Sequence, residues 1–196
     1  MFVSPMPTLY SCVKSGVSDQ LSPFPFFSGL LCGSLWLKYG TLVKDQTVIN
    51  VNLIGSALQL LYLGVYFLYC TKKASFMFKC GVVMVFLGIV LAYVNSVQPP
   101  NQSIISQLGL VCATVNVLAI ASPLAGLMDV LESKSTANMP FPLIFMGFLV
   151  TVQWFLYGYL ISDTYMQVPN GIGILLGIVQ LSLFVIYPST PSLKRD

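Results

Sequence analysis

The chain contains no histidine and few charged residues of either sign. Of its 196 residues, 8% are Asp, Glu, Lys or Arg, and 56% are hydrophobic. A soluble domain carries about 25% charged residues, so this chain has too few to cover a water-facing surface. The composition excludes an ordinary soluble protein and predicts a polytopic membrane protein.

The same shortage limits the chemistry that the protein can perform. The sequence offers no nucleophile–histidine pair and no paired carboxylates, and its five cysteines have no metal-binding spacing. The six acidic residues all fall in expected loops or at the ends of expected spans: Asp19, Asp45, Asp129, Glu132, Asp163 and Asp196. We therefore predict no enzyme activity, no metal or cofactor and no nucleic-acid partner. Ion-coupled pumping is disfavoured too, because it usually needs an ionisable group inside the membrane.

Six apolar segments are long enough to cross about 30 Å of hydrocarbon, and their length favours helices over strands. Short polar turns such as "TKKAS" and "QPPNQS" separate them and leave no room for a soluble domain. The expected spans are Phe24–Val43, Thr47–Cys70, Phe76–Val97, Ile104–Val130, Pro140–Ile161 and Tyr165–Tyr187.

The positive charges predict the orientation of these spans. The side expected to be cytosolic carries Lys14, Lys72, Lys73, Lys79, Lys134, Lys194 and Arg195, against Lys38 and Lys44 on the other side. Because cytosolic loops are enriched in Lys and Arg, the C-terminus is expected inside the cell. The glycosylation sequon at Asn101 would then lie outside or in a lumen.

The chain also repeats itself. Trp36, Tyr39, Gly40, Asp45 and Asn52 recur 118 residues later as Trp154, Tyr157, Gly158, Asp163 and Asn170. Ser4-Pro5 returns at the same offset as Ser122-Pro123. The matches include the only two tryptophans of the chain, so we interpret the pattern as an internal duplication.

The duplication predicts two three-helix repeats joined by one unpaired helix. Ser122-Pro123 lies near the end of a full expected helix but Ser4-Pro5 lies near residue 1, so most of the first helix is expected to be missing. An odd linker gives the repeats the same orientation. The expected parts are a first repeat at 1–70, a linker helix at 71–99, a second repeat at 100–188 and a cytosolic tail at 189–196. The residues expected to face the missing helix are Ser28, Gly29, Gly33, Asn52, Ser56 and Gln59.

This pattern resembles the SWEET family of sugar transporters in its animal form. The residues that carry the resemblance read "SPMPTLY", "LWLKYG", "VNLIG", "ASPL", "KSTANMPF", "QWFLYG", "VPNGIG" and "LGIVQLSLFVIYP". The resemblance spans nearly the whole chain and is best in the second repeat. It implies an all-α membrane protein built as three helices, one linker and three helices. Here that plan would give about six full spans and an N-terminal stub.

The resemblance implies a bidirectional uniporter that passes mono- or disaccharides such as glucose down their gradients. It also implies that Trp36, Asn52, Trp154 and Asn170 line the sugar pocket. These residue types suit a neutral sugar, because a C–H face stacks on an aromatic ring and an amide both donates and accepts hydrogen bonds. Plainer explanations stay open, since a membrane Trp is often an interface anchor and a membrane Asn can bridge helices.

A second set of residues is assigned to hinges and gating by the same resemblance. The hinge prolines are Pro5, Pro25, Pro123 and Pro140, and Tyr39, Gly40, Tyr157 and Gly158 complete the set. Proline kinks a helix when it lies in the interior, but near a helix start it is harmless. Two of the four, Pro25 and Pro140, lie near expected starts. The pairs Gly29/Gly33 and Gly173/Gly177 predict close helix packing.

Three functions remain in view. The first is the sugar uniporter, and the second is a shortened, non-transporting member that binds and modulates a full-length homologue. A multi-pass lipid enzyme is remote, because acid–base residues are lacking. The resemblance further implies homo- or hetero-oligomers in the plasma membrane or the Golgi membrane.

Overall fold

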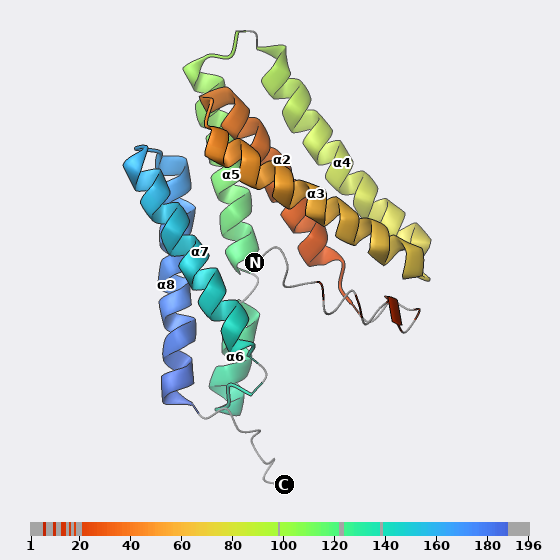
Figure 1. Cartoon of the computed structure of the whole chain (residues 1–196), viewed down its shortest axis with the longest axis vertical. Helices are drawn as coiled ribbons and strands as arrows, with labels where there is room; N and C mark the ends of the chain where they lie inside the picture. The colour runs from red at the N-terminus through yellow and green to blue at the C-terminus, as the bar shows by residue number, and fades with distance from the viewer. Residues whose placement is uncertain are drawn as a thin grey trace. The chain divides into compact units, whose positions relative to one another are not determined.

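A computed structural model of the chain describes residues 21–97, 99–121, 124–137 and 139–187, and residues 6, 10, 13, 14, 16 and 18 before them. The regular structure of this part is entirely α-helical (Figure 1). The helices are α2 Phe24–Val43, α3 Gln46–Tyr69, α4 Lys73–Ser96, α5 Gln102–Ala121, α6 Leu124–Ser133, α7 Phe141–Leu160 and α8 Thr164–Ile186. All except α6 are long and apolar enough to cross a membrane. The predicted all-α, six-span fold is confirmed.

The expected span Ile104–Val130 covers α5 and α6, and the two residues between these helices are not among those described. Pro123 and Pro5 lie outside the described residues, so their hinge role stays a prediction.

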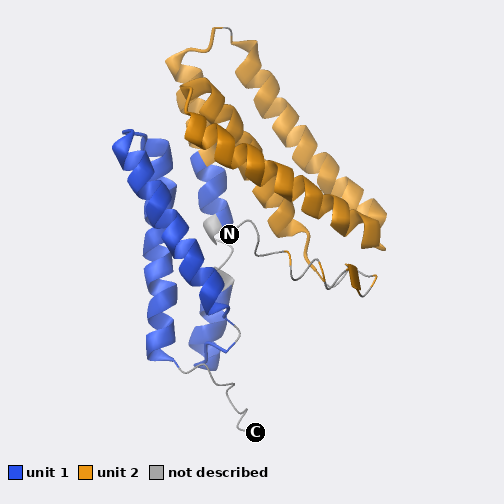
Figure 2. Cartoon of the chain, in the orientation of Figure 1, with its two compact units in different colours: residues 1, 113–196 blue, residues 2–112 orange. Residues whose placement is uncertain are grey.

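The chain divides into two compact units (Figure 2). The N-terminal unit comprises residues 2–112 and holds α2, α3, α4 and the first half of α5. The C-terminal unit comprises residue 1 and residues 113–196 and holds the rest of α5 with α6, α7 and α8. Each unit contains one closely packed helical hairpin, α2 with α3 or α7 with α8. Each hairpin carries one copy of the duplicated motif.

An aromatic cluster holds three helices of the N-terminal unit together. The Phe76 ring of α4 lies 5.2 Å from the Phe27 ring of α2 and stacks at 5.7 Å on the Tyr66 ring of α3. The buried cluster consists of Phe26, Phe27, Leu30, Tyr62, Leu63, Tyr66, Cys70 and Phe76. It fixes the end of the unit where α2 begins and where α3 passes into α4.

The two hairpins turn in the same way. Lys44 and Ser162 both adopt the left-handed conformation, with φ of 60° and 57°. The next residue, Asp45 or Asp163, donates its N–H to Gly40 O at 3.0 Å or to Gly158 O at 2.8 Å. The turn therefore closes onto the last turn of the first helix in both units.

The repeated aspartate also caps the second helix of each hairpin. Asp45 Oδ1 accepts from the Val48 N–H at 3.0 Å, and Asp163 Oδ1 accepts from the Tyr165 and Met166 N–H groups at 2.9 and 3.2 Å. A cap of this kind stabilises a helix by about 0.5–2 kcal/mol. The aspartate therefore recurs in the sequence because each hairpin needs a cap for its second helix.

The repeated glycine lets the two helices of each hairpin approach closely. A Cβ added at Gly40 would lie 3.0 Å from Val48 Cγ1, and one added at Gly158 would lie 2.9 Å from Met166 Cβ. In the second case the Gln167 nitrogen, at 3.2 Å, would also be crowded. A side chain at either position would force the hairpin apart.

The small and polar residues of α2 and α3 face one another. A Cβ at Gly29 would lie 2.7 Å from Gln59 Nε2, and one at Gly33 would lie 2.6 Å from Ser56 Oγ. The expectation that these four face a missing helix is therefore wrong, because the α2–α3 interface uses them. The predicted close packing at Gly29 and Gly33 is confirmed.

We expect Gly158→Ala to lower stability by about 1–3 kcal/mol, the usual cost of overpacking a tight contact. The matched control is Gly147→Ala on the same helix, where an added Cβ meets nothing within 4 Å. That control should be neutral, or more stable by up to about 1 kcal/mol, because alanine favours helix over glycine. Thermal unfolding of the purified proteins in detergent compares them. Equal midpoints for the two variants would contradict this account of the hairpin.

Candidate functional site

The two tryptophans have matching surroundings. Trp36 on α2 meets the Tyr39 ring edge-to-face at 5.4 Å and 83°, and Trp154 on α7 meets the Tyr157 ring at 5.8 Å and 90°. Such pairs contribute about 0.5–1.5 kcal/mol beyond burial. The repeated tyrosine therefore supports the ring of the tryptophan one turn before it.

The two asparagines also match. Nδ2 of Asn52 donates to Val48 O, and Nδ2 of Asn170 donates to Met166 O, both at 2.8 Å. These bonds lie within α3 and α8, so bridging between helices is not what the structure shows for either residue. An amide has two N–H donors and one oxygen acceptor. One N–H and the oxygen therefore remain for another partner.

Within each unit the tryptophan and the asparagine lie at the same level of the hairpin. Gly33, one turn before Trp36, packs against α3 so that an added Cβ would lie 3.7 Å from Asn52 O. In the other unit, a Cβ on Gly171 would lie 3.4 Å from the Phe155 ring. Gly171 directly follows Asn170 in the chain, and Phe155 directly follows Trp154. Each unit thus presents one aromatic ring and one amide at one height.

Neither tryptophan lies at a helix end. Trp36 is seven residues from the end of α2 and Trp154 is six residues from the end of α7, or about 10 Å along each helix. Trp36 is buried with 8% of its surface exposed, and Trp154 is half-buried. An anchor at the membrane surface would lie closer to the end of its span.

The two described prolines that were assigned to hinges lie at helix starts. Pro25 is the second residue of α2, and Pro140 is the residue that precedes α7. By place in their helices, Pro25 corresponds to Pro142 and Pro23 corresponds to Pro140. None of these interrupts a helical hydrogen bond, because the first N–H groups of a helix have no partner within it. The hinge and gating roles of Pro25, Pro140, Tyr39, Gly40, Tyr157 and Gly158 stay predictions.

Sequence reasoning missed one proline beside the site. Pro169 lies inside α8, is fully buried and directly precedes Asn170. A proline in a helix interior removes one backbone hydrogen bond and bends the helix. The sequence "VPNG" contains this proline next to Asn170. The search for repeated residues did not select it, because the equivalent position of the first repeat is Val51. The two units therefore differ at the residue before the asparagine.

A second difference lies on α3. Asn52, Ser56 and Gln59 are spaced to share one face of this helix. Ser56 Oγ and Gln59 Oε1 are buried without a hydrogen-bond partner among the described residues. In the C-terminal unit the equivalent positions hold Ile174 and Gly177. The polar face that begins at the asparagine therefore continues along α3 through Ser56 and Gln59 but does not continue at the equivalent positions of α8.

Comparison with known proteins identifies the family. A family described as "Sugar efflux transporter for intercellular exchange" matches residues 1–74 and 106–192. The chain is 41% identical over 176 residues to "Sugar transporter SWEET1" of Drosophila pseudoobscura pseudoobscura, covering 89% of this chain and 77% of that protein. The chain belongs to the SWEET family of sugar transporters.

Two further SWEET proteins agree. The chain is 33% identical over 203 residues to "Bidirectional sugar transporter SWEET7" of Arabidopsis thaliana, covering 100% of this chain and 79% of that one. The 3.7 Å structure of a eukaryotic SWEET transporter superposes with a TM-score of 0.85 at 30% identity, over 94% of this chain and 88% of that one. As a SWEET, the protein is a sugar transporter and not an enzyme.

The two matched segments of the SWEET family each contain one copy of the duplicated motif. Residues 1–74 include Trp36 and Asn52, and residues 106–192 include Trp154 and Asn170. Most of α4 lies between the segments. This helix is the one that sequence reasoning assigned as the unpaired linker.

We expect Asn52→Ala to weaken sugar binding roughly 5- to 150-fold, since losing a partner for a buried polar group costs about 1–3 kcal/mol. The matched control is Asn50→Ala, two residues away on the exposed side of α3, where the amide oxygen accepts from Gln46 Nε2. Trp154→Ala and Asn170→Ala should act like Asn52→Ala. Tryptophan fluorescence or calorimetry with glucose measures the loss. Glucose affinity that falls equally in both α3 variants, or in neither, would remove Asn52 from the site.

Proposed function

We propose that this SWEET chain is a bidirectional facilitative uniporter for a small neutral sugar, such as glucose, and that it works by alternating access. The observation that carries the proposal is the repeated Trp–Tyr pair with an asparagine at the same level. The name of the Arabidopsis relative, a bidirectional sugar transporter, supports the direction of transport.

The chemistry of the four residues suits a sugar. Trp36 and Trp154 supply aromatic rings, and each is held against a tyrosine ring in a T-shaped pair. Asn52 and Asn170 each hold one amide N–H against their own helix and can offer the rest of the amide to hydroxyl groups. No charged side chain is required, which favours a neutral substrate over an acidic or phosphorylated one.

The absence of acidic groups in the spans supports uniport over ion coupling. None of the six candidate spans contains Asp or Glu. Asp45 and Asp163 lie between helices, where they cap α3 and α8. Lys38 lies in the second half of α2 and donates to Asn95 Oδ1 at 2.7 Å. A proton-driven carrier needs an intramembrane group that binds and releases its ion.

We further propose that the protein assembles with copies of itself or with other SWEET chains, in the plasma membrane or the Golgi membrane. Large apolar side chains cover most of α4, including Met77, Phe78, Val82 and Ile89, which are all more than half exposed. Lipid or a neighbouring subunit must cover such a surface in a membrane.

We expect sugar flux to follow the sugar gradient in both directions and to be unaffected by protonophores or by replacement of sodium. The measurement is uptake and release of labelled glucose by liposomes that contain the purified chain. A proton-coupled sugar importer in the same liposomes provides the positive control for the protonophore. Accumulation above the external concentration that collapses with the proton gradient would refute uniport.

The same liposomes separate the transporter from the non-transporting alternative. Uptake by the chain alone supports the uniporter. No uptake alone, with a changed rate when a full-length SWEET is present in the same membrane, would instead establish a modulating subunit.

A further inference from the structure

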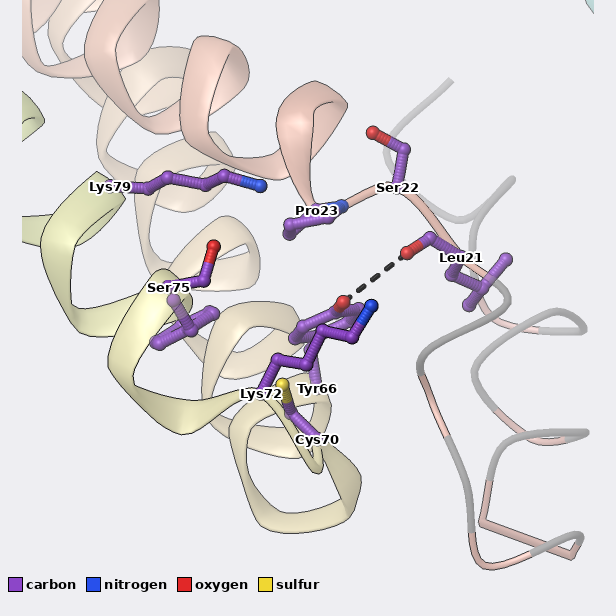
Figure 3. A pocket seen from close by; sticks show the side chains of 9 residues that line it. Leu21, Ser22, Pro23, Tyr66, Cys70, Lys72, Ser75 and Lys79 are labelled. Carbon is purple, nitrogen blue, oxygen red and sulfur yellow. Dashed lines mark hydrogen bonds between the residues drawn. The ribbon is translucent and has the colours of Figure 1, made fainter.

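The N-terminal unit contains a pocket that the sugar site does not use. It has a volume of about 440 Å³ and lies where α2 begins and where α3 passes into α4. The segment Leu21–Pro23 forms one wall, and Lys72, Ser75 and Lys79 form another. Figure 3 shows the Lys79 side chain extending toward Pro23, with Lys72 reaching alongside the hydrogen bond between Tyr66 and Leu21.

The base of this pocket is firmly built. Tyr66 and Phe76, which line it, belong to the buried aromatic cluster and stack on each other at 5.7 Å. The Tyr66 hydroxyl donates to Leu21 O at 3.2 Å. Ser18 donates its hydroxyl to Tyr66 O at 2.9 Å and its N–H to Tyr69 O at 3.2 Å. The wall formed by Leu21–Pro23 is therefore tied to α3.

The groups around the pocket favour a negative ligand. Two lysines line it, and none of its lining residues, all of them described, is acidic. The N-terminus of α4 adds partial positive charge, and no side chain caps it. Ser75 contributes a hydroxyl, and Ser22 uses its oxygen to accept from the Phe24 N–H, which leaves its own O–H to donate.

The location adds a second argument. The pocket lies at the ends of two spans, because α3 ends at Tyr69 and α4 begins at Lys73. Lipid phosphates lie at this depth of a bilayer. Long lysine side chains there place the stem against apolar surface and the ammonium among the headgroups. Basic pockets between spans are suited to anionic lipid headgroups.

We propose that this pocket binds a phosphate group, through Lys72, Lys79 and the N-terminus of α4. The phosphate belongs either to an anionic phospholipid or to a soluble phosphate compound, and both would use the same contacts. Bound phosphate would join the start of α2 to the start of α4. This site is independent of the sugar pocket and of the proposed uniport.

The test compares two double variants that remove equal charge. Lys72→Gln with Lys79→Gln removes both lysines from the pocket. Lys73→Gln with Lys44→Gln is the control, because the Lys73 ammonium lies over the Phe67 ring at 5.5 Å and Lys44 lies at the far end of α2. The full chain is purified in detergent and placed in nanodiscs of phosphatidylcholine with or without phosphatidylglycerol. Inorganic phosphate and glycerol 3-phosphate are tested in detergent.

A surface lysine contributes about fivefold to anionic binding, so we expect the pocket double variant to lose about 25-fold and the control less than about twofold. Added salt should weaken binding to the parent protein, because it screens the charges. Phosphatidylglycerol binding with this pattern, and none to the soluble compounds, identifies a lipid site. The same pattern with the soluble compounds identifies a free phosphate site.

Equal losses in the two double variants, or no binding of any probe to the parent, would overturn the proposal. Thermal unfolding in pure phosphatidylcholine checks that both variants fold. If the pocket double variant does not fold, Lys79→Gln alone should lose about fivefold and Lys73→Gln alone should lose nothing. Since sugar uptake is not the readout, failure here leaves the proposed uniport untouched.

Discussion

One aspartate in each hairpin closes the turn and caps the second helix, and the packing of the hairpin depends on it. The first N–H groups of a helix have no partner within it, so the turn that leads into the helix must supply one. Asp45 and Asp163 do this on both sides: the backbone N–H bonds to the preceding helix, and the side chain caps the following one. With the turn fixed, the glycine before it can pack against the second helix. The tryptophan and the asparagine then come to the same level.

The two units share this turn but differ in how the hairpin packs beyond it. In the N-terminal unit, Gly33 accommodates Ser56. In the C-terminal unit, Gly177 accommodates Phe148, whose ring carbon would lie 2.7 Å from an added Cβ. The two units therefore share the turn and the Trp–Tyr pair, while the interface beside them varies. Among the described residues, buried side-chain atoms without a hydrogen-bond partner lie in the N-terminal unit only.

Charge is separated from the proposed sugar site in this chain. The polar side chains proposed to bind the sugar, Asn52 and Asn170, are amides, which stay neutral at any pH that the protein meets. The lysines Lys72 and Lys79 lie instead at the end of the N-terminal unit where α3 passes into α4. An anionic ligand bound there would not compete with a neutral sugar, but it would contact the segment that leads into α2.

The sequence by itself determined the class of fold and pointed to the residues proposed for the sugar site. Low charge and long apolar runs required membrane helices, and the span Phe24–Val43 was predicted to the residue. The 118-residue recurrence identified the tryptophans and asparagines, because a repeated rare residue needs no knowledge of its contacts. Pro169 escaped this reasoning, since it occurs in only one repeat.

Only the tertiary structure decided which residues face one another. A polar face such as that of Asn52, Ser56 and Gln59 on α3 indicates a buried side of the helix but not which neighbour covers it. The sequence therefore could not show that Gly29 and Gly33 meet Gln59 and Ser56 rather than a further helix. It also could not place Lys72 and Lys79 around one pocket with Leu21–Pro23, because that pocket joins segments about fifty residues apart. Helix length and composition are local properties of the chain, whereas the direction of a side chain is fixed by the neighbour that packs against it.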